Sequence, residues 1–282
     1  MLLRRQKKRN NNSDKDYYFR FSLSCFGGAL LFMVGIGFDI NNIADDVLQE
    51  IDIVNIENPL YPNYLSGNYI GDTNRFKAKS IAKKIIVDGP YIDLNPGTPD
   101  IEIRKVVERK VLQSIDFALS IGSDEIIFLS TFLPMIQVDF YDNAHVSNSI
   151  NFWRNIISKT EGIKISLCNI FEYDPSVLLK IVEGVNCINF GLAFDVGHAY
   201  AYAKTTLKDF FTKIESFCSS VYLHGNNGTY DEHLNIFEGD LLKSDQFQDI
   251  IPLIRDKNII LKPFDKSMII KNVEILKSTL IQ

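Results

Sequence analysis

Short apolar runs alternate with amphipathic stretches along most of the chain, and this alternation predicts repeated strand–helix units. The apolar runs are nearly continuous, which is typical of parallel strands that are buried on both faces. Eight strands are expected, at Phe19–Ser24, Asp52–Ile56, Lys84–Asp88, Glu125–Leu129, Lys164–Cys168, Asn189–Asp195, Ser220–His224 and Asn258–Lys262. Eight strands that alternate with helices predict a single closed (β/α)8 TIM barrel.

The clearest helix is expected over Ile101–Ser120, where apolar residues recur with a period close to 3.6. The preceding Thr98-Pro99-Asp100 supplies N-capping side chains. The same period predicts four further helices, which begin or lie at Val177–Val182, Leu207–Phe217, Gln246–Ile254 and Met268–Leu280.

The N-terminal segment admits two interpretations. Residues 1–18 are basic and then polar, and we expect them to be a disordered leader before a barrel that covers residues 19–282. The apolar run Phe21–Phe38 is also typical of a signal peptide or membrane anchor. Because serine and glycine interrupt this run, and a spanning helix needs about 20 apolar residues, we favour a first barrel strand and no membrane partner.

Composition narrows the function classes. The chain has 282 residues, which fits one barrel of about 250 residues with its extensions. Its net charge of -5 gives no support to a large surface for nucleic acid. The four cysteines, which form no CxxC pair, argue against a zinc ribbon or a disulfide framework and suit a cytoplasmic protein; they are Cys25, Cys168, Cys187 and Cys218.

The histidines gather at two adjacent strand ends. His198, His224 and His233 are three of the four histidines, and Asp195 and Asp231 accompany them. In a TIM barrel the site lies at the carboxyl ends of the strands, so these side chains should meet, and Asp231 and His233 would share a face of an extended loop. Imidazole and carboxylate groups bind zinc, manganese or iron. The pattern therefore predicts a metal site or a polar substrate site, unless these residues only hold loops together.

Other strand ends carry further polar residues. Asp88, Asn169 and Asn226 follow three of the expected strands and are candidate substrate contacts. The fourth histidine, His145, lies in the polar stretch Asp142-Asn143-Ala144-His145 and is expected at the surface of a loop.

Several segments between the third and seventh expected strands resemble the xylose-isomerase-like superfamily of TIM barrels. This superfamily includes sugar phosphate isomerases/epimerases and metal-dependent abasic-site endonucleases. Phe194-Asp195-Val196-Gly197-His198 and Asp231-Glu232-His233 carry most of the resemblance, which extends from about Lys84 to Asp240. It also includes Asp88–Gly97 and Tyr222–Gly228. The resemblance implies a divalent metal ion at the barrel mouth.

The epimerase-like members imply one set of ligands. They hold the ion with a glutamate after strand five, an aspartate after strand six, a histidine after strand seven and a glutamate after strand eight. The two glutamates also move a proton next to a sugar carbonyl. Asp195 and His224 match this set, but Cys168 and Lys262 replace the two glutamates.

The endonuclease-like members imply a second set. Their histidines after strands three and four are replaced by Asp88 and Leu129. Their third-metal set of histidine, aspartate and histidine is matched by His198, Asp231 and His233.

The departures change the expected electrostatics. The loss of two carboxylates should weaken the binding of a divalent ion. Lys262 is expected to pair with Asp195 and replace part of the metal's charge, or to act as a base if burial lowers its pKa. Cys168 is expected to fill space rather than bind zinc. Glu172, four residues beyond strand five, either replaces a missing base or begins a loop.

Three functions remain. The first is an isomerase or epimerase of a small sugar or sugar phosphate, with zinc or manganese as its ion. The second is a non-catalytic barrel that binds a polyol or a protein partner. The third is metal-dependent hydrolysis of phosphodiesters in abasic DNA, against which the acidic balance argues. A fold alone cannot choose among them.

Overall fold

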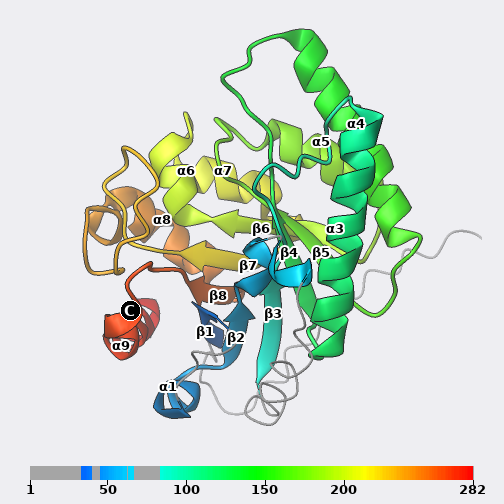
Figure 1. Ribbon diagram of the computed structural model, residues 1–282. Coiled ribbons are helices and arrows are strands. Elements are labelled where there is room, and N and C mark those ends of the chain that lie inside the picture. The colour runs from blue at the N-terminus through cyan, green and yellow to red at the C-terminus, as the bar shows by residue number, and fades with distance from the viewer. Residues whose placement is uncertain (1–32, 40–44, 62, 67–82, 282) are drawn as a thin grey trace, which may run out of the picture. The chain divides into compact units, whose positions relative to one another are not determined.

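Eight parallel strands close into one barrel and pair in the order of the chain (Figure 1). The computed structural model describes residues 33–39, 45–61, 63–66 and 83–281. The strands are β1 (Met33–Phe38), β2 (Ile53–Ile56), β3 (Lys84–Asp88), β4 (Glu125–Leu129), β5 (Lys164–Cys168), β6 (Phe190–Asp195), β7 (Cys218–Leu223) and β8 (Asn258–Leu261). The pairing of β1 with β8 closes the sheet, which confirms the predicted (β/α)8 barrel.

Helices connect the strands and cover the outside of the barrel (Figure 1). They are α1 (Asp45–Glu50), α3 (Ile101–Ser120), α4 (Asp139–Ile157), α5 (Ser176–Val185), α6 (Val196–Tyr202), α7 (Leu207–Ile214), α8 (Asp245–Ile254) and α9 (Ile269–Ile281). The expected cap of α3 is present, because the Asp100 side chain accepts hydrogen bonds from the N–H groups of Glu102 and Ile103. Within the described ranges, no helix has the length and apolar character needed to cross a membrane.

The first strand lies later in the chain than predicted. Phe19–Ser24 falls outside the described residues, as does the proposed leader, and β1 is formed by Met33–Phe38. This segment forms the strand because it pairs with β2 on one side and with β8 on the other. A Cβ atom at Gly35 would lie 2.5 Å from the Ile53 Cβ atom on β2, so glycine permits the close approach of the two strands. The apolar run Phe21–Phe38 does not by itself show which of its residues will pair with the neighbouring strands.

The prediction for His145 is wrong, because this histidine lies on α4 and is buried. Its exposed fraction is 3%, and its ring packs against Phe132 and Tyr141. The helical period places His145 on the same face as Phe152 and Trp153, and this face packs on the barrel. Burial lowers the pKa of His145 to about 4.

Side chains fill the barrel interior below the mouth. One apolar cluster takes a residue from each of β2 to β8, including Ile127 and Cys168. At the opposite end of the interior, the Glu125 carboxylate accepts hydrogen bonds from the hydroxyl groups of Ser166, Ser219 and Ser220. In the described residues the barrel interior is therefore a packed core, and the carboxyl ends of the strands are where a site is expected.

Candidate metal centre and barrel-mouth cavity

A cavity of about 440 Å³ opens at the carboxyl ends of the strands. Its lining includes Glu57 after β2, Asp88 on β3, Asp195 on β6, His198 on α6 and Lys262 after β8. Residues far apart in sequence meet here because every strand of a closed parallel barrel ends at the same rim. The cavity lies where the sequence predicted a site.

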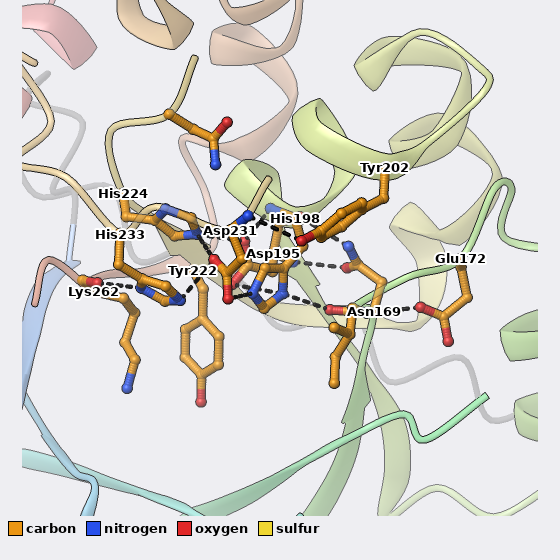
Figure 2. A network of polar contacts seen from close by, with 12 residues as sticks. Asn169, Glu172, Asp195, His198, Tyr202, Tyr222, His224, Asp231, His233 and Lys262 are labelled. Carbon is orange, nitrogen blue, oxygen red and sulfur yellow. Dashed lines mark hydrogen bonds and ion pairs between the residues drawn. The ribbon is translucent and has the colours of Figure 1, made fainter. Parts of the chain in front are cut away.

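Three histidines and one aspartate form a compact cluster beside the cavity (Figure 2), and all of them except His224 line it. His198, His224, Asp231 and His233 each offer one atom, and these four atoms lie within 4.8 Å of one another. Asp231 is central, because its carboxylate lies 3.3 Å from the His198 Nε2 atom and 3.1 Å from the His233 Nε2 atom. We call these four residues the histidine cage.

Backbone carbonyl groups fix the tautomer of each imidazole in the cage. The Nδ1 atom of His198 lies 3.0 Å from the Asn169 oxygen, that of His233 2.5 Å from the Lys262 oxygen, and that of His224 3.3 Å from the Gly225 oxygen. A carbonyl group only accepts, so each Nδ1 atom must carry the hydrogen. In the neutral ring, the Nε2 atom then has a free lone pair directed at the centre of the cage.

Without a cation the cage leaves polar atoms unsatisfied. The Nε2 atoms of His198 and His224 and the Oδ1 atom of Asp231 are buried, and the described residues offer them no hydrogen-bond partner. Such atoms are costly unless a proton or a metal ion joins them. Burial disfavours the charged imidazole, but the carboxylates of Asp195 and Asp231 outweigh it and raise the pKa of His198 to about 9. The cage therefore attracts positive charge, and its donor set fits a zinc-type ion.

Asp195 lies next to the histidine cage and contacts two of its histidines. Its carboxylate lies 3.3 Å from the His198 Nδ1 atom and 3.2 Å from the His224 Nε2 atom. It also caps α6, because its Oδ1 atom accepts a hydrogen bond from the His198 N–H group. Burial raises the pKa of Asp195, but the neighbouring histidines outweigh this and lower it to about 2. Asp195 is thus a carboxylate that touches two cage histidines.

Asn169 holds Asp195 rather than facing the cavity. Its side chain donates to the Asp195 carbonyl oxygen at 2.9 Å and accepts from the Asp195 N–H group at 2.8 Å. Asn226 is occupied in the same way, because it donates to the Tyr230 carbonyl oxygen and accepts from the Gly228 N–H group. Neither residue is among those that line the cavity.

His233 reaches the cage through an unusual backbone conformation. Its φ angle is +48°, so the extended loop expected from the sequence is wrong at this residue. Its ring stacks on His224 at 3.8 Å between centroids and on Phe264 at 4.3 Å. The Phe264 N–H group also donates to the His233 carbonyl oxygen. These contacts hold the left-handed residue in place.

Lys262 does not pair with Asp195, which corrects the expectation. Its ammonium group points away from the cage (Figure 2) and donates to Asn55 at 3.0 Å, Glu57 at 2.5 Å and Asp88 at 2.6 Å. Burial alone would lower its pKa, but Asp88 and Glu57 outweigh burial and raise the pKa of Lys262 above its ordinary value. Lys262 is therefore a cation. It could act as a base only if burial lowered its pKa, and that condition is not met.

Asp88 completes this buried network. Its Oδ1 atom accepts hydrogen bonds from the Asn55 amide and the Tyr222 hydroxyl group, and its Oδ2 atom accepts from Lys262. Asp88 is 3% exposed, and both of its oxygens are thus occupied. It lines the cavity, as the sequence predicted, but as part of an ion pair.

Glu57 is a site residue that the sequence reasoning missed. It follows β2, so the rule applied to the other strand ends would have found it. Its Oε1 atom accepts hydrogen bonds from Lys262 and, at 3.5 Å, from Lys266. Burial raises the pKa of Glu57, but the two lysines outweigh it and the pKa is lowered. Its Oε2 atom accepts no hydrogen bond from the described residues.

Cys168 and Glu172 lie behind the cavity wall. Cys168 is fully buried in the interior cluster, and burial followed by nearby carboxylates raises its pKa well above the ordinary value. This agrees with a space-filling role. Glu172 is 2% exposed; its Oε2 atom accepts from the Ile170 N–H group at 2.7 Å, whereas its Oε1 atom has no hydrogen-bond partner within the part of the chain that the structure describes. Burial raises the pKa of Glu172.

We expect Glu172→Gln to stabilise the protein at neutral pH. The folded pKa of Glu172 is raised, so its ionisation weakens folding as the pH rises from the unfolded pKa through the folded one. Glutamine does not ionise. The melting temperature should rise by about 2–4 °C at pH 8, equivalent to roughly 1 kcal/mol for a domain of this size, and the gain should vanish at pH 4. The exposed Glu161→Gln variant is the control, and an equal gain there would contradict the explanation.

Comparisons with known proteins agree with the barrel fold. The model of a family described as xylose isomerase-like TIM barrel matches residues 48–278. The protein MJ1311 of Methanocaldococcus jannaschii is 27% identical to this chain over 208 residues, which are 70% of each protein.

Solved structures share the fold. A D-tagatose 3-epimerase-like protein has a TM-score of 0.72 at 23% identity, with 88% of this chain and 97% of that chain covered. The protein TTHB071 from Thermus thermophilus, soaked with ZnCl2, has a TM-score of 0.66 at 20% identity and coverage of 87% and 97%. Endonuclease IV from the same organism has a TM-score of 0.63 at 13% identity and coverage of 88% and 99%. At these identities the likeness concerns the fold.

Proposed function

The chain belongs to the xylose isomerase-like TIM barrel family, and from this premise we propose that it is a metal-dependent isomerase or epimerase of a sugar-like ligand. The observation that carries the proposal is the cage. Three imidazole rings and one carboxylate each bring one possible ligand atom within 4.8 Å of the others, beside a cavity large enough for a ligand. The neighbours named as an epimerase-like protein and as a zinc-soaked protein support this choice.

The cage residues would hold a zinc or manganese ion. His198, His224, Asp231 and His233 supply nitrogen and oxygen ligands, and Asp195 touches two of these histidines. Zinc accepts this donor set readily, whereas manganese favours more oxygen ligands. When bound, such an ion polarises a carbonyl group and acidifies the neighbouring C–H group.

Glu57 is the carboxylate that we propose to move the proton. Among the described carboxylates that line the cavity, Asp195 and Asp231 contact the cage, and both oxygens of Asp88 are occupied. Among the described residues, none donates a hydrogen bond to the Glu57 Oε2 atom, and Lys262 holds its other oxygen. We assign Lys262 the task of positioning Glu57. This division replaces the two glutamates that the family resemblance implied, and Glu172 is not among the residues that line the cavity.

Proton exchange tests this proposal. The protein loaded with zinc or with manganese is incubated in D2O with a panel of free ketoses and ketose phosphates, and NMR measures deuterium at the carbon next to the carbonyl. We expect exchange with at least one substrate, none without metal, and a loss of about 10²–10⁴-fold in Glu57→Gln at unchanged metal content. Metal-loaded protein that exchanges nothing would contradict the enzyme and favour the non-catalytic barrel.

Hydrolysis of abasic DNA is the second candidate. It is favoured by His198, Asp231 and His233, which match the third-metal set implied by the endonuclease-like resemblance. However, the two lysines that line the cavity, Lys262 and Lys266, are both in contact with Glu57. Cleavage of an abasic oligonucleotide by the zinc-loaded protein, at low ionic strength, would favour this candidate over the first.

A further inference from the structure

One loop carries two of the four residues of the histidine cage. Asp231 and His233 both belong to residues 225–240, which lie between β7 and the turn that precedes α8. We call these residues the ligand loop. The other two members are held differently, since His198 lies on α6 and His224 directly follows β7. The spacing of the cage, and with it the affinity for a metal ion, therefore depends on how firmly the ligand loop is held.

Backbone hydrogen bonds close the base of the ligand loop. Gly225 and Leu234 exchange two bonds, of 2.9 and 3.0 Å, in an isolated antiparallel bridge. The Asn226 carbonyl oxygen accepts two further bonds from the N–H groups at the end of the loop, those of Asp240 and Leu241. Asp231 lies within the stretch that the bridge encloses, so its own position depends on contacts beyond the bridge.

Tyr202 on α6 holds the ligand loop at Asp231 (Figure 2). The Tyr202 hydroxyl oxygen accepts a hydrogen bond of 2.9 Å from the Asp231 N–H group. Its ring packs edge-on against Phe171, with 5.1 Å between the centroids, and Phe171 lines the cavity. Tyr202 thus ties the residue at the centre of the cage to the helix that also carries His198.

Asn272 on α9 holds the ligand loop just after His233. Its side chain accepts a hydrogen bond of 2.7 Å from the Ile236 N–H group, and it donates to the Asn235 side chain at 2.7 Å and to the Met268 carbonyl oxygen at 2.8 Å. Asn272 is 0% exposed, and the other buried residues of α9 are apolar. Asparagine is a poor helix former and is costly to bury without partners. Its bonds to the ligand loop account for its place in this apolar face.

The conformation of the ligand loop makes these contacts important for metal binding. His233 has a φ angle of +48°, which is unfavourable for a residue other than glycine and persists only when its surroundings hold it. A loop that relaxed would have to be reordered whenever an ion binds, and the cost of ordering is subtracted from the affinity. Removal of an outer contact that orients metal ligands typically weakens metal binding by about 10–100-fold.

We propose that Tyr202 and Asn272 are positioning residues of the metal centre, which hold the ligand loop in its binding conformation and thereby raise the affinity for zinc. Neither residue is among those that line the cavity. This inference rests on the metal centre of the proposed function and is independent of its proton transfer. It deepens that function by placing part of the control of metal affinity on α6 and α9.

The zinc dissociation constant tests the proposal. It is measured for the full chain and each variant by competition with a chromogenic chelator, below the melting temperature of every variant. Tyr202→Phe removes one hydroxyl group and keeps the ring, and it should weaken zinc binding by about tenfold. Asn272→Leu replaces the amide by an apolar group of similar size, and it should weaken zinc binding by about 10–100-fold. If Asn272→Leu does not fold, Tyr202→Phe decides the question alone.

Two matched controls separate positioning from stability. Tyr200→Phe removes a hydroxyl group from another half-buried tyrosine of α6, one that makes no side-chain hydrogen bond to the described residues. Leu276→Ala shortens a fully buried side chain of α9 that cannot form hydrogen bonds, and it should lower the melting temperature of the metal-free protein. Both controls should bind zinc as tightly as the wild type.

The outcomes distinguish this inference from the proposed function. Zinc binding of wild-type strength in both Tyr202→Phe and Asn272→Leu would overturn the inference and leave the metal centre intact. Equal weakening in Leu276→Ala would also overturn it, because loss of stability would then explain the effect. A wild-type protein that binds no zinc would overturn the proposed function together with the inference.

Discussion

Replacing His198 and His233 together by alanine is expected to reduce bound zinc from about one ion per chain to a small fraction of that value. The double variant removes two of the four ligands and leaves Asp231 and His224, which are 4.0 Å apart, as the remaining pair. Two ligands cannot enclose a zinc ion, which structural and catalytic sites hold with three or four protein ligands. Mass spectrometry of the metal content, after dialysis against a weak chelator, measures the effect.

The same preparation gives a second readout. Because an ion that binds only the folded state stabilises it by mass action, added zinc should raise the melting temperature of the wild type and not that of the double variant. His145→Ala is the control, since it removes a buried histidine outside the cage. Wild-type protein without metal, after supply of zinc and manganese, would contradict the metal centre. Undiminished zinc in the double variant would place the ion elsewhere.

Lys262→Met is expected to lower the free energy of unfolding by about 3–5 kcal/mol. Methionine has a side chain of similar length that is stable in a buried position. However, it leaves the carboxylates of Glu57 and Asp88 without the ammonium group that binds them. Uncompensated buried charge is the costly part of breaking such a pair. Urea denaturation at pH 7.5 measures the loss, and metal content shows whether the cage survives.

The loss should depend on pH. The folded pKa of Glu57 is lowered against the opposing effect of burial, chiefly by Lys262 and Lys266. This carboxylate therefore contributes stability above its unfolded pKa, and the contribution fades as the pH falls through the folded pKa. The gap between wild type and Lys262→Met should be widest near neutral pH and narrow below pH 4.

A double variant distinguishes charge from packing. Lys262→Met combined with Glu57→Gln removes one buried negative charge with its partner, and it should be more stable than Lys262→Met alone. A single variant that loses less than about 1 kcal/mol would show that water or movement of Glu57 compensates for the missing ammonium group. That result would also remove the reason to regard Lys262 as the residue that positions Glu57.

Local pattern predicted most of the barrel. Strands β2 to β8 and helix α3 lie within a residue or two of their expected bounds. Parallel strands buried on both faces must be continuously apolar, and α3 shows its 3.6-residue period and its Asp100 cap in sequence. Helix α4 was missed because its first half is polar and its N-cap residue, Val138, provides no side-chain cap.

The residues of the cage were also predicted from the sequence, because the rule that a TIM barrel has its site at the carboxyl ends of the strands was enough. Asp195 ends β6, and the other four residues follow β6 or β7; parallel strands bring their carboxyl ends together. The four are His198, His224, Asp231 and His233. What the sequence did not contain was the conformation of His233 or the direction of the Nε2 atoms. These follow from carbonyl groups on other segments, including that of Lys262.

The sequence by itself thus determined the barrel, and it predicted which five residues the strand ends would bring together at the candidate metal position. Tertiary structure alone decided the partners of Lys262. Its choice of Glu57 and Asp88 over Asp195 depends on contacts among strands β1, β2, β3 and β8, which closure of the barrel brings together. Gly37 on β1 permits them, since a Cβ atom there would lie 2.0 Å from Glu57 Oε1 and 3.0 Å from Lys262 Nζ. An ion pair forms where backbones leave room for two side chains, and that room is a property of the assembled barrel.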